Sequence, residues 1–267
     1  MELVGYLASI LIGVSLGLIG SGGSILTVPL LVYFFHLAPL LATTYSLAIV
    51  GLSSIAGVIS RLKQKLVDFK TIFIFGIPSI IGVFSSRKFL LPAIPELIYD
   101  GPVIVVTKNH FIMLFFATLM LIAALSMILG KNKEEEKGIL PVYGFTLMLV
   151  GLAEGLLTGI VGAGGGFLII PALVILAKLP MKKAIATSLV IISIKSLVGF
   201  TGDLLSTAID WSFLSKIILL ATLGIITGNY LNKKMEGAKL KKGFGYFVLA
   251  MAFIIFIEQF CFSNLVN

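Results

Sequence analysis

Two related stretches decide the fold. The first is Gly17-Leu-Ile-Gly-Ser-Gly-Gly-Ser-Ile-Leu-Thr-Val-Pro-Leu-Leu31, and 142 residues later comes Gly159-Ile-Val-Gly-Ala-Gly-Gly-Gly-Phe-Leu-Ile-Ile-Pro-Ala-Leu173. Each interrupts a strongly apolar run with a cluster of glycines and then continues as apolar sequence. In hydrocarbon a helix can be broken only where protein or a water-filled cavity surrounds the open backbone, because lipid offers no hydrogen-bonding partner. The stretches therefore predict two helices broken inside a membrane, and each break is a candidate binding site.

The composition excludes a soluble domain. Hydrophobic residues make up 58% of the 267 residues and charged residues only 12%, so we expect a multi-pass protein of the cytoplasmic membrane with the lipid bilayer as its surroundings. The net charge of +8 comes from basic residues in short loops, where they orient a membrane protein, and it does not favour a nucleic-acid partner. A lone cysteine, Cys261, and the absence of a GxxxxGK[ST] motif predict no metal, no other cofactor and no ATP site.

Apolar runs without strand alternation follow one another along the chain, and all of them are expected to be helical. The predicted segments are 3–20, 23–35, 40–60, 70–86, 110–130, 141–161, 166–177, 184–202, 212–231 and 243–262. The expected fold class is therefore an all-α integral membrane protein.

The two glycine stretches belong to a longer internal repeat. At the same offset of 142, Ala42 matches Ala184 and Asp68 matches Asp210, and this register continues without a gap over roughly 66 residues. The sequence predicts two repeats of about five helical segments each. The first covers residues 1–130 and the second residues 141–267, with 131–140 as a cytoplasmic linker.

Loop charges predict that the repeats are inverted. The loop at 61–70 is rich in Lys and Arg, whereas the equivalent loop in the second half carries Asp203 and Asp210 and no basic residue. Because short cytoplasmic loops are enriched in basic residues, equivalent loops should lie on opposite sides. The lysines at 178–183 are then cytoplasmic only if the second broken helix forms a hairpin that enters and leaves on one side. Both termini are then external, the two half-helix hairpins meet near the membrane midplane, and 86–110 forms an external surface connection.

These residues resemble the TauE/SafE family of membrane anion transporters, also called the sulfite exporter or toluenesulfonate uptake permease family. The resemblance lies in the doubled G-x-x-G-x-G-G-G-x-x-x-x-P-like motif, the run Ala186-Thr-Ser-Leu189 and the pair Asp210-Trp211, and it covers nearly the whole chain. It implies transport of small sulfur-containing anions such as sulfite or sulfoacetate, with the glycine motifs near the path. The first motif departs from the pattern because Ser24 stands where the second has Gly166.

We therefore expect a secondary transporter that works by alternating access. An anion channel and a transporter of a non-sulfur organic anion are the alternatives. An enzyme is not expected, because the deep polar residues include no histidine-containing cluster.

Two charges lie deep in apolar sequence. Lys195 is about 12 Å of helix from the charged end at Asp203, and a charge at bilayer depth must face a cavity or a partner. Glu154 is the other deep charge. Either the two neutralise each other, or Lys195 faces the anion and Glu154 exchanges a proton that couples transport to the proton gradient.

The remaining candidates supply backbone N–H groups and hydroxyls to an anion at the two breaks. The full set of substrate-binding candidates is Gly22, Gly23, Ser24, Thr27, Gly164, Gly165, Gly166, Ser188, Lys195 and Ser196. The alternatives are that the glycines allow close helix packing and that the serines bond their own backbone. Asp68 and Asp210 are expected to be helix N-caps.

Overall fold

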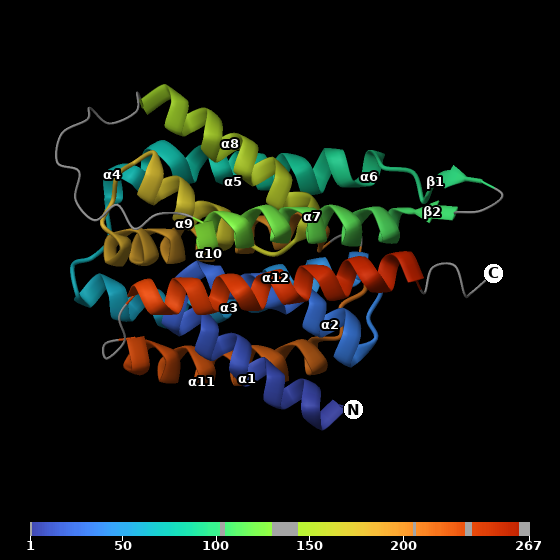
Figure 1. Cartoon of the computed structure of the whole chain (residues 1–267), viewed down its shortest axis with the longest axis horizontal. Helices are drawn as coiled ribbons and strands as arrows, with labels where there is room; N and C mark the ends of the chain where they lie inside the picture. The colour runs from blue at the N-terminus through green and yellow to red at the C-terminus, as the bar shows by residue number, and fades with distance from the viewer. Residues whose placement is uncertain (1, 102–104, 130–143, 205–206, 233–236, 262–267) are drawn as a thin grey trace.

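The computed structural model describes residues 2–101, 105–129, 144–204, 207–232 and 237–261, and the predicted linker at 131–140 lies outside them. Long helices run beside one another in a bundle (Figure 1). Among the described residues, six helices are long and apolar enough to cross a membrane: Pro39–Lys63, Phe69–Ala93, Lys108–Ser126, Gly144–Val161, Met181–Asp203 and Trp211–Leu231.

The elements follow the predicted segments closely. They are α1 (Glu2–Ile19), η1 (Gly20–Leu26), α2 (Thr27–Phe35), α3 (Pro39–Lys63), α4 (Phe69–Thr71), η2 (Ile72–Gly76), α5 (Ile77–Ser85), η3 (Ser86–Leu90), α6 (Leu91–Ala93), β1 (Leu97–Asp100), β2 (Val105–Thr107), α7 (Lys108–Leu129), α8 (Gly144–Val161), α9 (Gly166–Ile175), α10 (Met181–Asp203), α11 (Trp211–Asn232) and α12 (Gly237–Cys261). All ten predicted segments are helical over most of their length. Apolar residues on the outer faces of the bundle stay exposed, for example Leu11, Phe73 and Ile257, as expected of lipid-facing positions.

The 86–110 stretch departs from the sequence prediction in two respects. Helical structure continues from Phe69 to Ala93 through two π-helical turns, η2 and η3, so residues 86–93 are not a surface connection. The fold is also not purely helical, because β1 and β2 form a small antiparallel hairpin in which Leu97 pairs with Thr107. Pro95 lies two residues before β1, and β-branched residues in both strands, with Tyr99 in β1, favour extended structure.

Helices pack in pairs that follow the internal repeat. The packed pairs are α1 with α11, α8 with α5, α3 with α10 and α7 with α12. Equivalent glycines bring the first two pairs together: a Cβ on Gly13 would lie 2.0 Å from the Ala221 carbonyl oxygen, and one on Gly155 would lie 2.1 Å from that of Ser79. The α1–α11 and α8–α5 interfaces thus use equivalent positions, 142 residues apart.

Two further hydrogen bonds are equivalent at that offset and lie at opposite ends of α3 and α10. The Asp68 N–H donates to Thr187 Oγ1 at 2.9 Å, and the Asp210 N–H donates to Tyr45 Oη at 2.7 Å. The connections α3–α4 and α9–α10 lie at one end of the bundle, at the left in Figure 1, while α2–α3 and the β-hairpin lie at the other end. The broken helix α1–η1–α2 therefore has both outer ends at one end of the bundle, and the α8–α9 hairpin has both at the opposite end.

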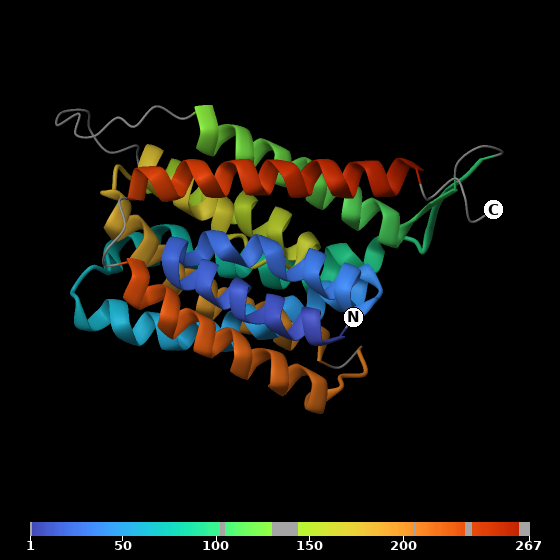
Figure 2. The same ribbon diagram turned by 60° about the horizontal axis from the view of Figure 1, so that its bottom comes forward.

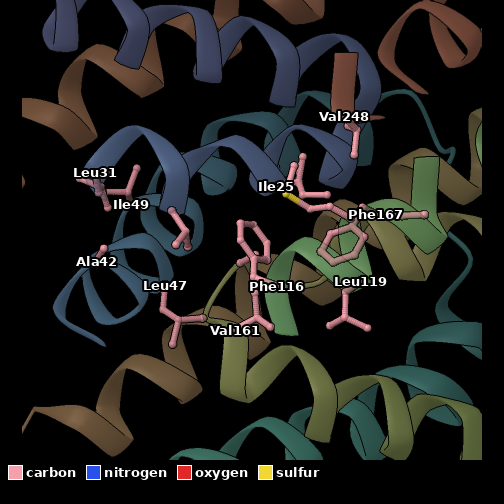
Figure 3. Close-up of a cluster of buried hydrophobic side chains, with 14 of the residues drawn as sticks. Ile25, Leu31, Ala42, Leu47, Ile49, Phe116, Leu119, Val161, Phe167 and Val248 are labelled. Carbon is pink, nitrogen blue, oxygen red and sulfur yellow. The ribbon is translucent and has the colours of Figure 1, made fainter. Parts of the chain in front are cut away.

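The two breaks adjoin each other inside the bundle, because η1 contacts both α9 and α10. Ile25 of η1 and Phe167 of α9 belong to one buried cluster with Phe116 of α7 and Val161 of α8 (Figure 3). Viewed after a 60° turn, α12 crosses the bundle beside α7 (Figure 2), and Val248 of α12 joins the same cluster. The main apolar core thus surrounds the place where the two broken helices meet.

Candidate functional site

Lys195 and Glu154 form a buried ion pair. The Lys195 Nζ of α10 lies 2.5 Å from Oε1 of Glu154 on α8, and their side chains are 0% and 4% exposed. Ser79 of α5 donates to Glu154 Oε2 at 2.6 Å, and Thr158 Oγ1 lies 3.3 Å from both Lys195 Nζ and Glu154 Oε1. We call these four residues the Lys195–Glu154 centre. The two deep charges therefore meet as an ion pair, which is one of the two arrangements that the sequence left open.

The second glycine break lies directly against this centre. Gly162, Gly164 and Gly165 all have φ between +65° and +72°, a left-handed conformation that disfavours side chains. A Cβ on Gly165 would lie 2.1 Å from Glu154 Oε1 and 2.7 Å from Lys195 Nζ. Only glycine therefore lets the backbone at the start of α9 approach the ion pair this closely.

The other candidates of the second half lie near this centre or bond to their own helix. A Cβ on Gly164 would lie 2.9 Å from Ser196 Oγ, and Gly166 is buried as the first residue of α9. Ser188 donates to the Ile185 carbonyl at 3.0 Å, which is the alternative predicted for serines in membrane helices. Gly164, Gly165, Glu154, Lys195 and Ser196 are thus gathered in one region of the fold.

The first glycine break has a different geometry. Residues 20–26, which include Gly22, form the 3₁₀ helix η1, and Gly20 at its start has a positive φ of +71°. A Cβ on Gly23 would lie 2.4 Å from the Leu16 backbone nitrogen, so Gly23 allows η1 to pack against α1. Ser24 and Thr27 are both buried, and the Thr27 N–H donates to the Ser24 carbonyl.

The two halves are also chemically unequal. At the offset of 142, Glu154 and Lys195 of the second half match Ile12 and Ser53 of the first. Ser79 of the first half matches Ala221 of the second. The Ser53 hydroxyl donates to the Ile49 carbonyl within its own helix at 2.5 Å. The charges of the centre thus occur in the second half alone, against a neutral counterpart in the first.

Sequence reasoning missed a second buried ion pair. Arg87 of η3 donates through Nη1 to Asp203 Oδ2 at 2.8 Å and to Thr43 Oγ1 at 3.0 Å, and Thr44 Oγ1 donates to the same Asp203 oxygen at 2.8 Å. The sequence analysis placed Arg87 in an external connection, but its side chain is 0% exposed. The apolar residues that follow it, Phe89 to Leu91, were the available signal that the helix continues.

The sequence model of the family described as Sulfite exporter TauE/SafE matches residues 6–255. The chain belongs to the TauE/SafE family. Membership covers both glycine breaks, the Lys195–Glu154 centre and the Arg87–Asp203 pair. It makes the chain a multi-pass membrane protein of a transporter family rather than an enzyme.

Relatives of this TauE/SafE protein come from bacteria and an archaeon. It is 28% identical over 252 residues to a "Probable membrane transporter protein" of Xylella fastidiosa (strain 9a5c), covering 92% of this chain and 91% of the relative. It is 28% identical over 247 residues to "Probable membrane transporter protein YunE" of Bacillus subtilis (strain 168), covering 82% and 84%. It is 29% identical over 204 residues to "Probable membrane transporter protein MJ0441" of Methanocaldococcus jannaschii, covering 73% and 71%. No solved structure matches the chain.

Asp210, which belongs to the TauE/SafE resemblance, and its repeat mate Asp68 are helix caps, as predicted. Asp68 Oδ1 accepts from the Thr71 N–H at 2.8 Å, and Asp210 Oδ1 accepts from the Phe213 N–H at 3.0 Å. Each carboxylate satisfies a backbone donor that the first turn of a helix leaves open.

Proposed function

We propose that this TauE/SafE protein is a secondary transporter of small sulfur-containing anions, such as sulfite or a sulfonate, and that it works by alternating access. The observation that supports this most is Lys195, a completely buried cation whose Nζ would lie 2.7 Å from a Cβ on Gly165 at the break of a glycine-broken helix. Buried ionisable groups within membrane helices mark substrate or ion pathways. The sulfur-anion class rests on the family description.

The centre offers a way to bind an anion and release it. Glu154 accepts hydrogen bonds from Lys195, Ser79 and Thr158, so the resting site is electrically neutral. An entering anion competes with Glu154 for the Lys195 ammonium. When Glu154 takes up a proton it loses its charge and no longer holds Lys195, which is then free to bind the anion. The attraction between Lys195 and the anion is strong because the site is poorly hydrated. This sequence couples one proton to one anion moving in the same direction.

The proposed architecture is a pair of inverted repeats, residues 1–130 and 141–267, that rock about the meeting point of the two breaks. The exchange of equivalent packing partners and the outer ends of the two broken helices at opposite ends of the bundle both favour it. Exposed lysines at 63, 65, 182 and 183 belong to one end of the bundle, which we assign to the cytoplasm. Both chain termini are then external.

Uptake of radiolabelled sulfite into proteoliposomes tests this function. We expect saturable uptake that unlabelled sulfite inside the vesicles accelerates, and loss of uptake in Lys195→Ala. The matched control is Ser53→Ala, which changes the equivalent position of the first half and should transport normally. Uptake without acceleration from the inside would indicate a channel, and uptake of carboxylates in place of sulfur anions would overturn the substrate class.

Glu154→Gln tests the coupling in the same vesicles. Glutamine keeps the size of the side chain but cannot exchange a proton, so anion exchange should continue while accumulation driven by a pH gradient is lost. Accumulation in Glu154→Gln with the same pH dependence as the wild type would refute coupling through this carboxylate.

A further inference from the structure

We infer that Arg87 forms a second oxyanion-binding station, with Asp203 holding the guanidinium in place while the station is closed. The inference rests on the proposed function, since it adds a step to the same pathway. It follows from the hydrogen bonds that one guanidinium nitrogen of Arg87 makes and from the lack of a hydrogen bond, among the described residues, at the other two.

Among the residues that the structure describes, only one of the three Arg87 nitrogens has a partner. Nη1 contacts Asp203 and Thr43, whereas Nε and Nη2 are buried and make no hydrogen bond to any described residue. An unmet buried donor is destabilising, and a charged one more so. Nε–H and Nη2–H lie on one edge of the planar guanidinium, and this edge matches two oxygens of a carboxylate, sulfonate or sulfite. The edge that suits a bidentate oxyanion is therefore the one left unbound.

The unbound edge faces the turn between α8 and α9. A Cβ on Gly162 would lie 2.3 Å from Arg87 Nη2, and Gly162 has a φ of +69°. Beside it, the Ser86 hydroxyl is also buried without a partner in the described part of the chain, and it lies 2.8 Å from where a Cβ on Gly159 would be. Gly162 thus lies closely over the Arg87 guanidinium, and Gly159 over the Ser86 hydroxyl. If the turn between α8 and α9 separates from η3, space opens for an oxyanion against Arg87 and Ser86.

The station is in line with the Lys195–Glu154 centre. Asp203 follows Lys195 by eight residues on α10, and Arg87 follows Ser79 by eight residues on the helical run from Phe69 to Ala93, a rise of about 12 Å in each case. Both steps lead away from the end of the bundle that carries the exposed lysines. We therefore place the Arg87 station on the external side of the Lys195–Glu154 centre.

Arg87→Lys separates an oxyanion station from a structural ion pair. Lysine keeps the positive charge opposite Asp203 but has no planar pair of N–H groups. We expect the half-saturating concentration of sulfite presented from the external side of oriented vesicles to rise about tenfold or more, the usual scale for losing a charge-assisted hydrogen bond. The melting temperature in detergent should stay near that of the wild type.

The matched control is Arg61→Lys, since Arg61 is also a buried arginine and donates through Nη2 to the Gly17 carbonyl at 3.3 Å in the first half. Asp203→Asn is an independent test, because Asp203 competes with the anion for the Arg87 guanidinium. Removing its charge should lower the half-saturating concentration of sulfite presented from the external side. Wild-type half-saturation in both Arg87→Lys and Asp203→Asn, or an equal rise in Arg61→Lys, would overturn the station while transport through Lys195 stands.

Failure of the proposed function has a different signature, namely no transport of any sulfur anion by the wild type. In that case the wild type and Arg87→Lys are compared by the rise in melting temperature that sulfate and acetate cause in each purified protein. Stabilisation that Arg87→Lys removes would support the station without the function. Stabilisation that is the same in both proteins, or absent in both, would overturn it.

Discussion

Replacing both members of the central ion pair separates its structural role from its role in transport. The singles Lys195→Met and Glu154→Leu each leave one uncompensated charge at a position that is at most 4% exposed. Removing one partner of a buried ion pair typically destabilises a protein by roughly 3–5 kcal/mol. The lower end is expected here, because Ser79 and Thr158 still offer hydroxyls to the remaining charge.

The double variant should recover most of this loss. Met and Leu have volumes close to those of Lys and Glu, and a buried ion pair replaced by apolar residues is often neutral or stabilising. The first half already packs Ile12 and Ser53 at the equivalent positions, so the surroundings tolerate uncharged side chains. The hydroxyl of Ser79 loses its acceptor, which costs about 1 kcal/mol.

The assay pairs thermal melting of purified protein in detergent with sulfite uptake in proteoliposomes. We expect both single variants to melt below the wild type. Lys195→Met should transport nothing, whereas Glu154→Leu should lose accumulation of sulfite driven by a pH gradient. The double variant should melt within a few degrees of the wild type and still transport nothing. Wild-type transport by the double variant would refute the reasoning, because the pair would then serve stability alone.

Two further predictions concern the second glycine break and the first helix cap. Gly165→Ala places a Cβ 2.1 Å from Glu154 Oε1 at a φ of +72°, so it should destabilise this conformation by roughly 2–5 kcal/mol and abolish uptake. Gly144→Ala is its control, because the nearest atom is 4.0 Å away and both melting temperature and uptake should stay unchanged; an active, stable Gly165→Ala would contradict the assignment. Asp68→Ala removes the cap on Thr71 and should lower stability by about 1 kcal/mol in a melting experiment. Its half-saturating sulfite concentration should match the wild type, and a change there would assign Asp68 a role beyond capping.

The helical segments and their caps could be predicted from the sequence because they depend on local properties. Length and apolar continuity predicted all ten helical segments, and the aspartates at 68 and 210 cap the helices that follow them. The paired strands at 97–100 and 105–107 were missed, since strands of three and four residues leave no clear alternation.

The functional site depended on the tertiary structure to a greater degree. The depth of Lys195 and Glu154 was visible in the sequence, and their pairing was one of two open interpretations. Ser79 and Thr158 carried no signal that would separate them from other hydroxyls in membrane helices. The two glycine motifs look alike in sequence, yet the second places two consecutive left-handed glycines, Gly164 and Gly165, beside a buried cation.

The sequence by itself determined which segments are helical, the family, and the internal repeat, because each depends on neighbouring residues or on a register along the chain. Only the tertiary structure decided which charges meet. Glu154 and Lys195 are 41 residues apart, and Arg87 and Asp203 are 116 apart. Contacts across such separations depend on how α5, α8 and α10 pack. Arg87 is therefore an external charge when read in sequence and a buried one once η3 packs beside α10 and α8.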